Sequence, residues 1–222
     1  NYPIRHLQSP ESVIDTNDPL GEIQFSPPDE GSGTDAILVS AAIQARAESG
    51  FGSGTNATSL DFKTASSEAA ATKMSLTSGG QLLIGTTNSN FDAGADDLIV
   101  GNGSGDSGIT IYTGSSAGDK GSIFFADAEV GSSAEKKGQI SYEQNNEIMT
   151  FFTNDTLAMQ IDLNGHVTMP KQSAFLATAS TMTNIAEGSL VTVTYNSEIF
   201  DQNADFNTST HTFTAPVTGR YQ

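Results

Sequence analysis

The segment Gly103-Ser104-Gly105-Asp106-Ser107-Gly108 follows the apolar run Leu98-Ile99-Val100 and formally matches the GxGxxG fingerprint of dinucleotide-binding proteins. In that chemistry the glycines let the backbone approach a pyrophosphate, which the N-terminal amides of a following helix bind. The next residues here are Ile109-Thr110-Ile111-Tyr112, an alternating pattern typical of a strand. The sequence therefore predicts a turn or hairpin loop at this position and no bound cofactor.

The three histidines, His6, His166 and His211, lie far apart and show no paired-ligand spacing. His166 follows the turn signal Asn164-Gly165, and His211 lies in an alternating run, so both are expected at solvated strand positions. Composition leaves a Ser-His-Asp triad open, but no Gly-x-Ser-x-Gly elbow supports one. The chain has no cysteine, which excludes a thiolate nucleophile, a zinc-thiolate site and a disulfide framework.

Several carboxylates could in principle do chemistry. Asp96 with Asp97, or Asp155 with Asp162, could be imagined as the acid and base of a glycosidase. Asp92, Asp96 and Asp97 could also offer oxygen ligands to calcium, although no EF-hand loop is present. With 26 acidic residues in the chain, neighbouring carboxylates are expected by chance. We therefore predict solvated surface for all of them, and expect no enzyme activity, no cofactor and no metal.

The charge balance narrows the classes of partner. The formal net charge is −17, from 26 acidic and 9 basic side chains. Nucleic-acid binding needs Lys and Arg to neutralise phosphates, and an anionic membrane would repel this chain. No apolar run is long enough to span a membrane. The chain opens with Asn1-Tyr2-Pro3, without Met, so we expect a piece of a longer protein.

The elements that must position these residues are short strands. Period-2 runs separated by Gly, Ser, Asn and Asp predict an all-β protein. They include Ile23-Gln24-Phe25, Leu60-Asp61-Phe62, Met74-Ser75-Leu76, Ile109-Thr110-Ile111 and Val191-Thr192-Val193-Thr194. The Ala-rich stretch Asp35–Ser49 can be interpreted as helix or strand, and we favour a strand because its neighbours are strand-like.

An internal repeat is the most informative feature. The first copy runs from Gly21-Glu22-Ile23-Gln24-Phe25 through Leu60-Asp61-Phe62-Lys63-Thr64 to Met74, Gly80 and Leu82. The second runs from Gly121-Ser122-Ile123-Phe124-Phe125 through Met149-Thr150-Phe151-Phe152-Thr153 to Met159, Gly165 and Val167. Each unit has few apolar residues for a core of its own. We therefore expect a β module used twice, with partner surface supplied by other copies of the chain.

Two stretches resemble known families. Lys73-Met74-Ser75-Leu76 through Ile84-Gly85-Thr86-Thr87 resembles a module of bacteriophage tail fibres. Asp97-Leu98-Ile99-Val100-Gly101 through Gly121-Ser122-Ile123-Phe124-Phe125 is similar to fibres of marine cyanobacterial phages. The second copy departs from this module, with Thr168-Met169-Pro170 where Ile-Gly-Thr-Thr would follow. The resemblance implies an elongated homotrimeric fibre of short β-repeat modules, located in the virion tail.

The C-terminal stretch is similar to the opening of a TNF-like jelly roll, the fold of the globular head of complement component C-one-q. The similarity is carried by Ser173-Ala174-Phe175-Leu176-Ala177, Val191–Tyr195, Phe200-Asp201, Phe206–Thr210 and Phe213-Thr214-Ala215-Pro216-Val217-Thr218-Gly219-Arg220-Tyr221. It implies a partial TNF-like head that packs with two others about a threefold axis. The strand pattern ends at Gln222, short of a full jelly roll.

Together these features predict an N-terminal linker (1–20), two shaft modules (21–87 and 88–170) and a partial head (171–222). Candidate trimer-axis residues are Phe25, Phe62, Phe125 and Phe152. The expected function is host adhesion by a structural virion protein. The expected partners are two further copies of the chain, other phage tail proteins at the N-terminal region and a host surface receptor, with glycan as the expected class. A tailspike-like polysaccharide depolymerase and a secreted bacterial adhesin with a TNF-like head remain alternatives.

Overall fold

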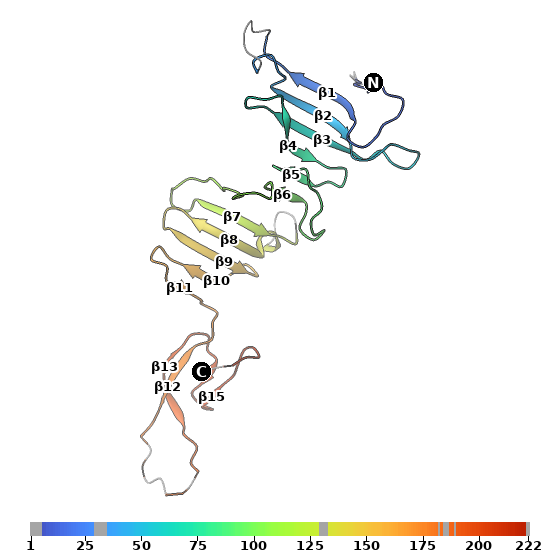
Figure 1. The fold of residues 1–222 in the computed structure, drawn as a ribbon. Helices are drawn as coiled ribbons and strands as arrows, with labels where there is room; N and C mark the ends of the chain where they lie inside the picture. Colours follow the sequence, from blue (N-terminus) through green and yellow to red (C-terminus); the bar gives the residue numbers. More distant parts are fainter. Residues whose placement is uncertain are drawn as a thin grey trace. The chain divides into compact units, whose positions relative to one another are not determined.

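The computed structural model describes residues 6–28, 35–128, 133–181, 183, 187–188 and 190–220. The regular structure in this part of the chain is β-strand, apart from one short 3-10 helix, η1 (Ser133–Lys136). Figure 1 shows the strands in chain order, and they group into two compact units, Asn1–Thr110 and Ile111–Gln222. The predicted all-β class is therefore confirmed.

The first unit holds a six-stranded sheet whose strands follow one another in sequence order. The strands are β1 (Pro19–Phe25), β2 (Ala41–Ala47), β3 (Thr58–Thr64), β4 (Ala71–Leu76), β5 (Leu82–Ile84) and β6 (Leu98–Val100). The first five pair antiparallel as a meander, and β6 pairs parallel to β5. β2 lies within the ambiguous stretch Asp35–Ser49, so the strand interpretation of that stretch is confirmed.

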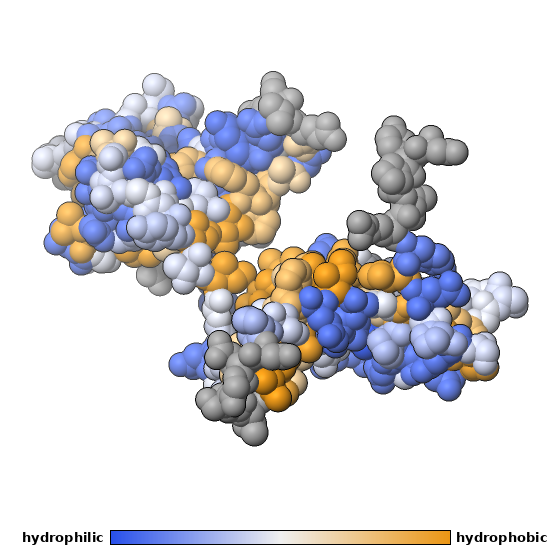
Figure 2. Space-filling view, turned by 90° about the horizontal axis from the view of Figure 1, so that it is seen from above, coloured by the Kyte–Doolittle hydropathy of each residue, from blue (hydrophilic) through white to orange (hydrophobic). Residues whose placement is uncertain are grey.

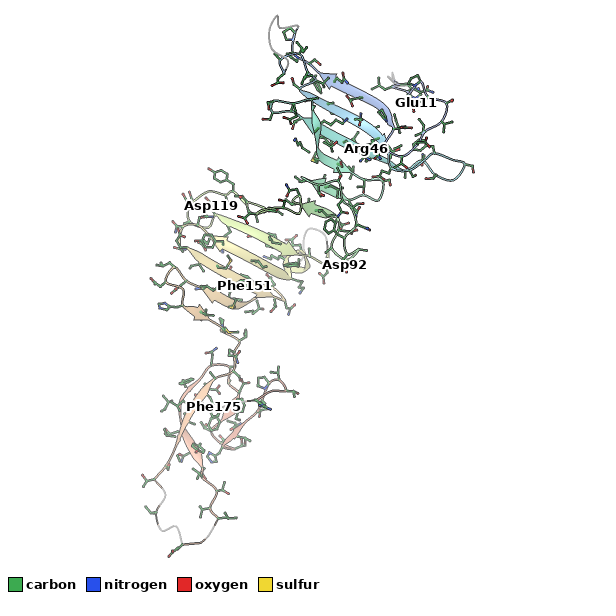
Figure 3. All side chains as sticks on the ribbon, viewed as in Figure 1. Glu11, Arg46, Asp92, Asp119, Phe151 and Phe175 are labelled. Carbon is green, nitrogen blue, oxygen red and sulfur yellow. The ribbon has the colours of Figure 1, made fainter. Side chains whose placement is uncertain are left out.

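The second unit holds a five-stranded antiparallel sheet and two shorter strand pairs. The sheet contains β7 (Lys120–Phe125), β8 (Gly138–Glu143), β9 (Ile148–Thr153), β10 (Thr156–Ile161) and β11 (Val167–Thr168). The pairs are β12 (Phe175–Ala179) with β13 (Tyr195–Asp201), and β14 (Phe206–Asn207) with β15 (Thr212–Phe213). Phe175, labelled in Figure 3, stacks on Phe206 and Phe213 with ring centroids 4.9 and 4.8 Å apart.

The repeat found in the sequence corresponds to a repeat in the fold. Its aligned segments lie on β1 and β7, β3 and β9, β4 and β10, and β5 and β11. Both sheets run through these strands as a meander in the same order. The strands β2 and β8, which the alignment did not match, take equivalent places between them. The two modules therefore share one topology, although their loops differ in length.

The last hairpin of each meander has the same geometry. In the first module Gly80 N donates to Thr77 O at 3.0 Å, and Thr77 N donates to Gln81 O at 3.0 Å. In the second module Gly165 N donates to Asp162 O at 2.9 Å, and Asp162 N donates to His166 O at 3.1 Å. Gly80 and Gly165 both have positive φ, 88° and 82°. Glycine is the residue that adopts this conformation without steric cost.

Two strands expected from alternation do not form. Ile109-Thr110-Ile111 is irregular, and Val191-Thr192-Val193-Thr194 is irregular up to Tyr195, where β13 begins. Alternation alone is insufficient, because a strand also needs a neighbour that accepts its backbone hydrogen bonds. These two segments have no ladder partner among the described residues.

Two boundaries also differ from the sequence-based division. Leu98–Val100, assigned to the second module, is β6 of the first sheet, and the compact units divide between Thr110 and Ile111. The segment expected as a linker (1–20) already includes the start of β1. Its described part also contacts the sheet, because Asn17 N donates to Ala47 O at 2.8 Å and Phe51 N donates to Ile14 O at 2.9 Å.

Candidate self-association surface

Directly paired residues of an antiparallel sheet share one face, so the register identifies the side chains on each face. In the first sheet Ile23 pairs with Ile43, Ile43 with Phe62, Phe62 with Met74 and Met74 with Ile84. The neighbouring row pairs Leu60 with Leu76, Leu76 with Leu82 and Leu82 with Leu98. We call this side the apolar face of the first sheet.

The second sheet has an equivalent face. Ile123 pairs with Ile140, Ile140 with Phe151 and Phe151 with Met159. The next row contains Tyr142, Met149, Ile161 and Val167. Because Ile123, Phe151 and Met159 align with Ile23, Phe62 and Met74 in the sequence repeat, the repeat places the same side-chain types on the same face twice.

The apolar faces are only partly covered, because Ile43, Phe62 and Phe151 are half-buried and several of their neighbours are exposed. Ile23 is 51% exposed, Leu76 45%, Leu98 49% and Ile123 50%. In the described residues the buried hydrophobic set contains only Ala42, Ala47, Leu83, Ile99 and Phe206. Figure 2 shows hydrophobic side chains gathered in contiguous surface areas. Monomeric proteins rarely leave large contiguous apolar surfaces in water, and such surfaces mark interaction sites.

The accessible surface supports the same conclusion. The chain exposes 16328 Å² for a mass of 23.1 kDa. A compact monomer of this mass exposes about 9,700 Å², and two separate compact units of half the mass expose about 11,600 Å² together. The excess therefore does not depend on how the two units are placed. Taken together, the two units bury less surface than two self-sufficient domains of this mass would.

The four phenylalanines proposed for a trimer axis do not all share the apolar faces. Phe25 and Phe62 lie on the apolar face of the first sheet, and Phe125 lies on that of the second. Phe152 pairs with Gln139, which pairs with Phe124, so Phe152 lies on the opposite face from Phe125. The four residues therefore do not lie on one kind of face, and their place at a trimer axis stays a prediction. Phe151, labelled in Figure 3, is the residue that corresponds to Phe62.

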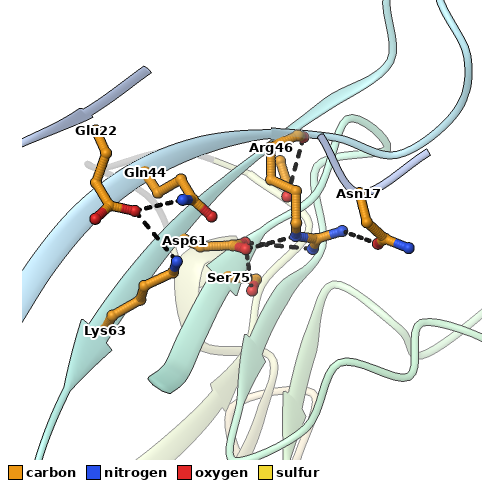
Figure 4. A network of polar contacts seen from close by, with 8 residues as sticks. Asn17, Glu22, Gln44, Arg46, Asp61, Lys63 and Ser75 are labelled. Carbon is orange, nitrogen blue, oxygen red and sulfur yellow. Dashed lines mark hydrogen bonds and ion pairs between the residues drawn. The ribbon is translucent and has the colours of Figure 1, made fainter. Parts of the chain in front are cut away.

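The opposite face of the first sheet is polar and more shielded than the apolar face. Asp61, at its centre, is 1% exposed, and Ser59 and Ser75 are also 1% exposed. The Arg46 guanidinium donates to Asp61 from Nε at 2.7 Å and from Nη2 at 3.4 Å, and Ser75 Oγ donates to Asp61 at 2.8 Å. Figure 4 shows Arg46 held on its other side by Asn17, at 3.1 Å. The burial of Asp61 is thus compensated by three donors.

A second group of polar contacts crosses the same face between β1, β2 and β3. Glu22 Oε2 accepts hydrogen bonds from Gln44 Nε2 and from Lys63 Nζ, the latter at 3.2 Å (Figure 4). Gln24 Nε2 donates to the other oxygen of Glu22 at 2.7 Å. Three adjacent strands are therefore linked by side chains as well as by their backbone ladders.

The electrostatics of this face favour the ionised carboxylates. Burial raises the pKa of Asp61, but the hydrogen bonds from Arg46, Ser75 and Ser59 outweigh it, so the net pKa lies below the ordinary value of 3.8. The hydrogen bond from Gln24 is the main cause that lowers the pKa of Glu22, and the ion pair with Lys63 adds to it. Both carboxylates are negatively charged at neutral pH.

The other sequence candidates are not brought together into one site. No helix follows Gly103–Gly108, which lies in a loop. Asp155 precedes β10 and Asp162 follows it, and six extended residues separate them by roughly 20 Å, which is too far for a glycosidase pair.

The histidines and the calcium candidates also lie apart. His166 Nδ1 contacts Asp162 in the hairpin at 3.0 Å, while His211 Nδ1 contacts Tyr195 O at 2.9 Å. Asp92, labelled in Figure 3, accepts from Gly94 N at 2.9 Å, whereas Asp96 accepts from Gln81. In the described ranges no group of three or more His, Asp or Glu side chains could hold a metal ion.

The connected group of Arg46, Asp61 and Ser75 was not predicted from the sequence. Arg46 and Asp61 lie 15 positions apart on neighbouring strands, so their contact depends on the register of β2 and β3. The sequence did contain an indication that Asp61 belongs to the polar face. Asp61 interrupts the apolar residues Leu60 and Phe62, as a polar-face residue in a period-2 strand must.

No protein-family model matches the chain. No curated protein matches it in sequence. One solved structure that it resembles is the carboxy-terminal domain of the bacteriophage T5 L-shaped tail fiber with its intra-molecular chaperone domain. The TM-score is 0.38 and the identity 13%, over 86% of this chain and 66% of that one. Similarity at this level does not establish a shared fold. Within the described residues no helix is long and apolar enough to cross a membrane.

Proposed function

We propose that this chain is a structural segment of a bacteriophage tail fibre that associates with further copies of itself and contributes to adhesion to the host-cell surface. The observation that carries the self-association is the apolar face, which is repeated in two modules and is partly exposed in the single chain. Burying such faces between copies removes apolar surface from water, at about 25 cal/mol per Å².

The sequence resemblance to phage fibre modules supports three copies about one axis. In a symmetric assembly each copy presents the same face, so Ile23, Phe62 and Phe151 would each meet their own counterparts or immediate neighbours. The C-terminal segment, with Phe175 stacked on Phe206 and Phe213, is proposed as part of a TNF-like head. The segment before β1 is proposed to join the chain to other tail proteins.

The avidity of adhesion would increase with the number of copies of the chain in one fibre. When three identical weak sites are held in one particle, the second and third contacts become intramolecular and the overall avidity rises steeply. A fibre therefore needs no deep ligand pocket on any one copy. In this proposal the chain has no catalytic role.

Mass measurement in solution tests the self-association. The full chain is expected to have three times its monomer mass, and Ile23→Asp is expected to shift it to monomer. Tyr112→Asp is the matched control, because Tyr112 is 97% exposed and lies outside both sheets. A soluble, stably folded monomer of the unaltered chain contradicts the proposed assembly.

Adhesion is tested separately with fluorescently labelled chain and a panel of bacterial cells that includes marine cyanobacteria. Saturable binding to some strains, competed by unlabelled chain, is expected. Absence of binding across the panel by a chain of trimeric mass would contradict the adhesion role and leave the structural role intact.

A further inference from the structure

A polar groove of about 340 Å³ lies on the polar face of the first sheet, next to the Arg46–Asp61 pair. Its floor contains Arg46 of β2, Ser75 of β4 and Leu83 of β5, and its walls are the hairpin Thr77–Gln81 and the segment Thr87–Ser89. This volume is within the range of small-molecule sites. The groove lies entirely within the first unit, on the side away from the apolar face.

The walls of the groove are fixed by hydrogen bonds between the segments that form them. Gln81 Nε2 donates to Ser89 O at 3.2 Å, which joins the hairpin to the segment after β5. Ser78 N donates to Glu48 Oε2 at 3.1 Å, which joins the hairpin to the end of β2. A site whose walls are already ordered loses less conformational entropy when a ligand binds.

Unused hydrogen-bonding groups of both kinds border the groove. Three of the five guanidinium N–H groups of Arg46 are used by Asp61 and Asn17, and the side chain is 22% exposed. Glu48 uses Oε2 for Ser78, and Oε1 receives no donor from the described residues. Thr87 and Ser89 add hydroxyl groups, each of which can donate and accept.

The charges that line the groove, and the net charge of the chain, indicate which class of ligand the groove can bind. One arginine and one glutamate line the groove, and the chain as a whole carries a charge of −17, so a phosphate or another anion would meet net repulsion. Leu83 is the one apolar side chain of the lining, so an apolar ligand would leave the polar groups unsatisfied. The hydroxyl groups of a neutral polyhydroxyl compound can donate to the acceptors of the groove and accept from its donors.

We propose that this groove binds a short neutral saccharide. Arg46 and the hydroxyls of Thr87 and Ser89 donate to sugar oxygens, and Glu48 Oε1 accepts from a sugar hydroxyl. No aromatic ring lines the groove, so one site binds weakly. The inference deepens the proposed function and rests on it for its biological effect, because several grooves in one assembled fibre would act together.

The test is a titration of the full, assembled chain with neutral disaccharides, lactose and maltose, followed by backbone amide chemical shifts. Glucuronate and inorganic phosphate are the charged probes. Saturable shifts confined to Ser78, Gln81 and Ser89 and their neighbours are expected with a neutral disaccharide. Glu48→Gln is expected to weaken this binding at least tenfold. Glu143→Gln, which alters a carboxylate paired with Lys120 at 3.5 Å in the other unit, is expected to leave it unchanged.

Three outcomes would overturn the proposal: no saturable shift with either disaccharide, tighter binding of phosphate or glucuronate, or equal effects of Glu48→Gln and Glu143→Gln. These outcomes are distinct from failure of the proposed function. A trimeric chain that adheres to cells but lacks saccharide shifts overturns the groove alone. A monomeric chain that still shows the shifts overturns the fibre assembly alone.

Discussion

Gly80 and Gly165 occupy the same position in two hairpins of one chain, with φ of 88° and 82° and the same pair of backbone hydrogen bonds around them. In both hairpins a side chain at the first position adds a further bond: Thr77 Oγ1 accepts from Gln81 N at 3.1 Å, and Asp162 Oδ1 accepts from His166 N at 2.9 Å. The two modules therefore repeat the geometry of a turn as well as a pattern of strands.

Replacing either hairpin glycine by alanine is expected to destabilise its own sheet by about 1–2 kcal/mol, because an L-residue in the left-handed region crowds its own carbonyl. The space around both glycines is open, so the cost comes from the backbone alone. Urea unfolding of Gly80→Ala and Gly165→Ala measures it. Gly54→Ala, also in open space but without a positive φ, is the control and is expected to change little. Equal effects at all three positions would contradict the prediction.

Asp61→Ala is expected to lower the free energy of unfolding of the first unit by about 3–5 kcal/mol, because it leaves the Arg46 guanidinium and the Ser75 hydroxyl without their buried acceptor. Chemical denaturation of the full chain measures this. The control is Glu68→Ala, whose contact with Lys73 is a solvated one at 3.9 Å and whose loss is expected to be undetectable. A small effect at Asp61 would show that the network is not a source of stability.

The same carboxylate predicts a pH dependence. The folded-state pKa of Asp61 is lowered, so its contribution is fully present above the ordinary, unfolded-state pKa of 3.8. It is lost as the pH falls through the lower folded-state value, because the unfolded chain then binds the proton more tightly. Wild type should therefore exceed Asp61→Asn in stability at pH 7, and the gap should narrow below about pH 4. A gap that stays constant from pH 7 to pH 3 would contradict this assignment.

Phe151 and Phe152 are adjacent in sequence and lie on opposite faces of the second sheet. Phe151→Asp is expected to weaken self-association, since it places a charge in the repeated apolar face, whereas Phe152→Asp is expected to weaken it much less. Sedimentation of both variants at equal concentration compares them, and far-ultraviolet circular dichroism checks that the strands are kept. A larger loss of association from Phe152→Asp would show that the opposite face is the interface.

The sequence predicted the parts of the fold that depend on local pattern. Ile23-Gln24-Phe25, Leu60-Asp61-Phe62 and Met74-Ser75-Leu76 all lie in strands, and the repeat alignment predicted which strands are equivalent. The alignment paired Phe62 with Phe151, and the register places both on apolar faces. Period-2 alternation is a direct property of the extended backbone, which explains why it predicted these strands and their faces correctly.

The predictions that failed concern segments whose pairing partners are distant in the sequence. Ile109-Thr110-Ile111 alternates like a strand but has no ladder, while Leu98–Val100 finds one beside β5 in the first sheet. The sequence also could not predict which face of the first sheet is shielded from solvent. The burial of Asp61 on that face follows from Arg46, which lies across it. A polar residue in a strand is assigned to solvent by default, and only the register brings its donors together.

The exposed apolar faces also have a consequence for how heat and dilution act on the protein. If two unassembled modules are each only partly stabilised by their own contacts, assembly supplies the missing stability by mass action. The melting temperature should then rise with chain concentration. Recovery of the assembled form after denaturation should fall when the refolding solution is dilute, because single chains then meet too rarely to supply each other's missing contacts.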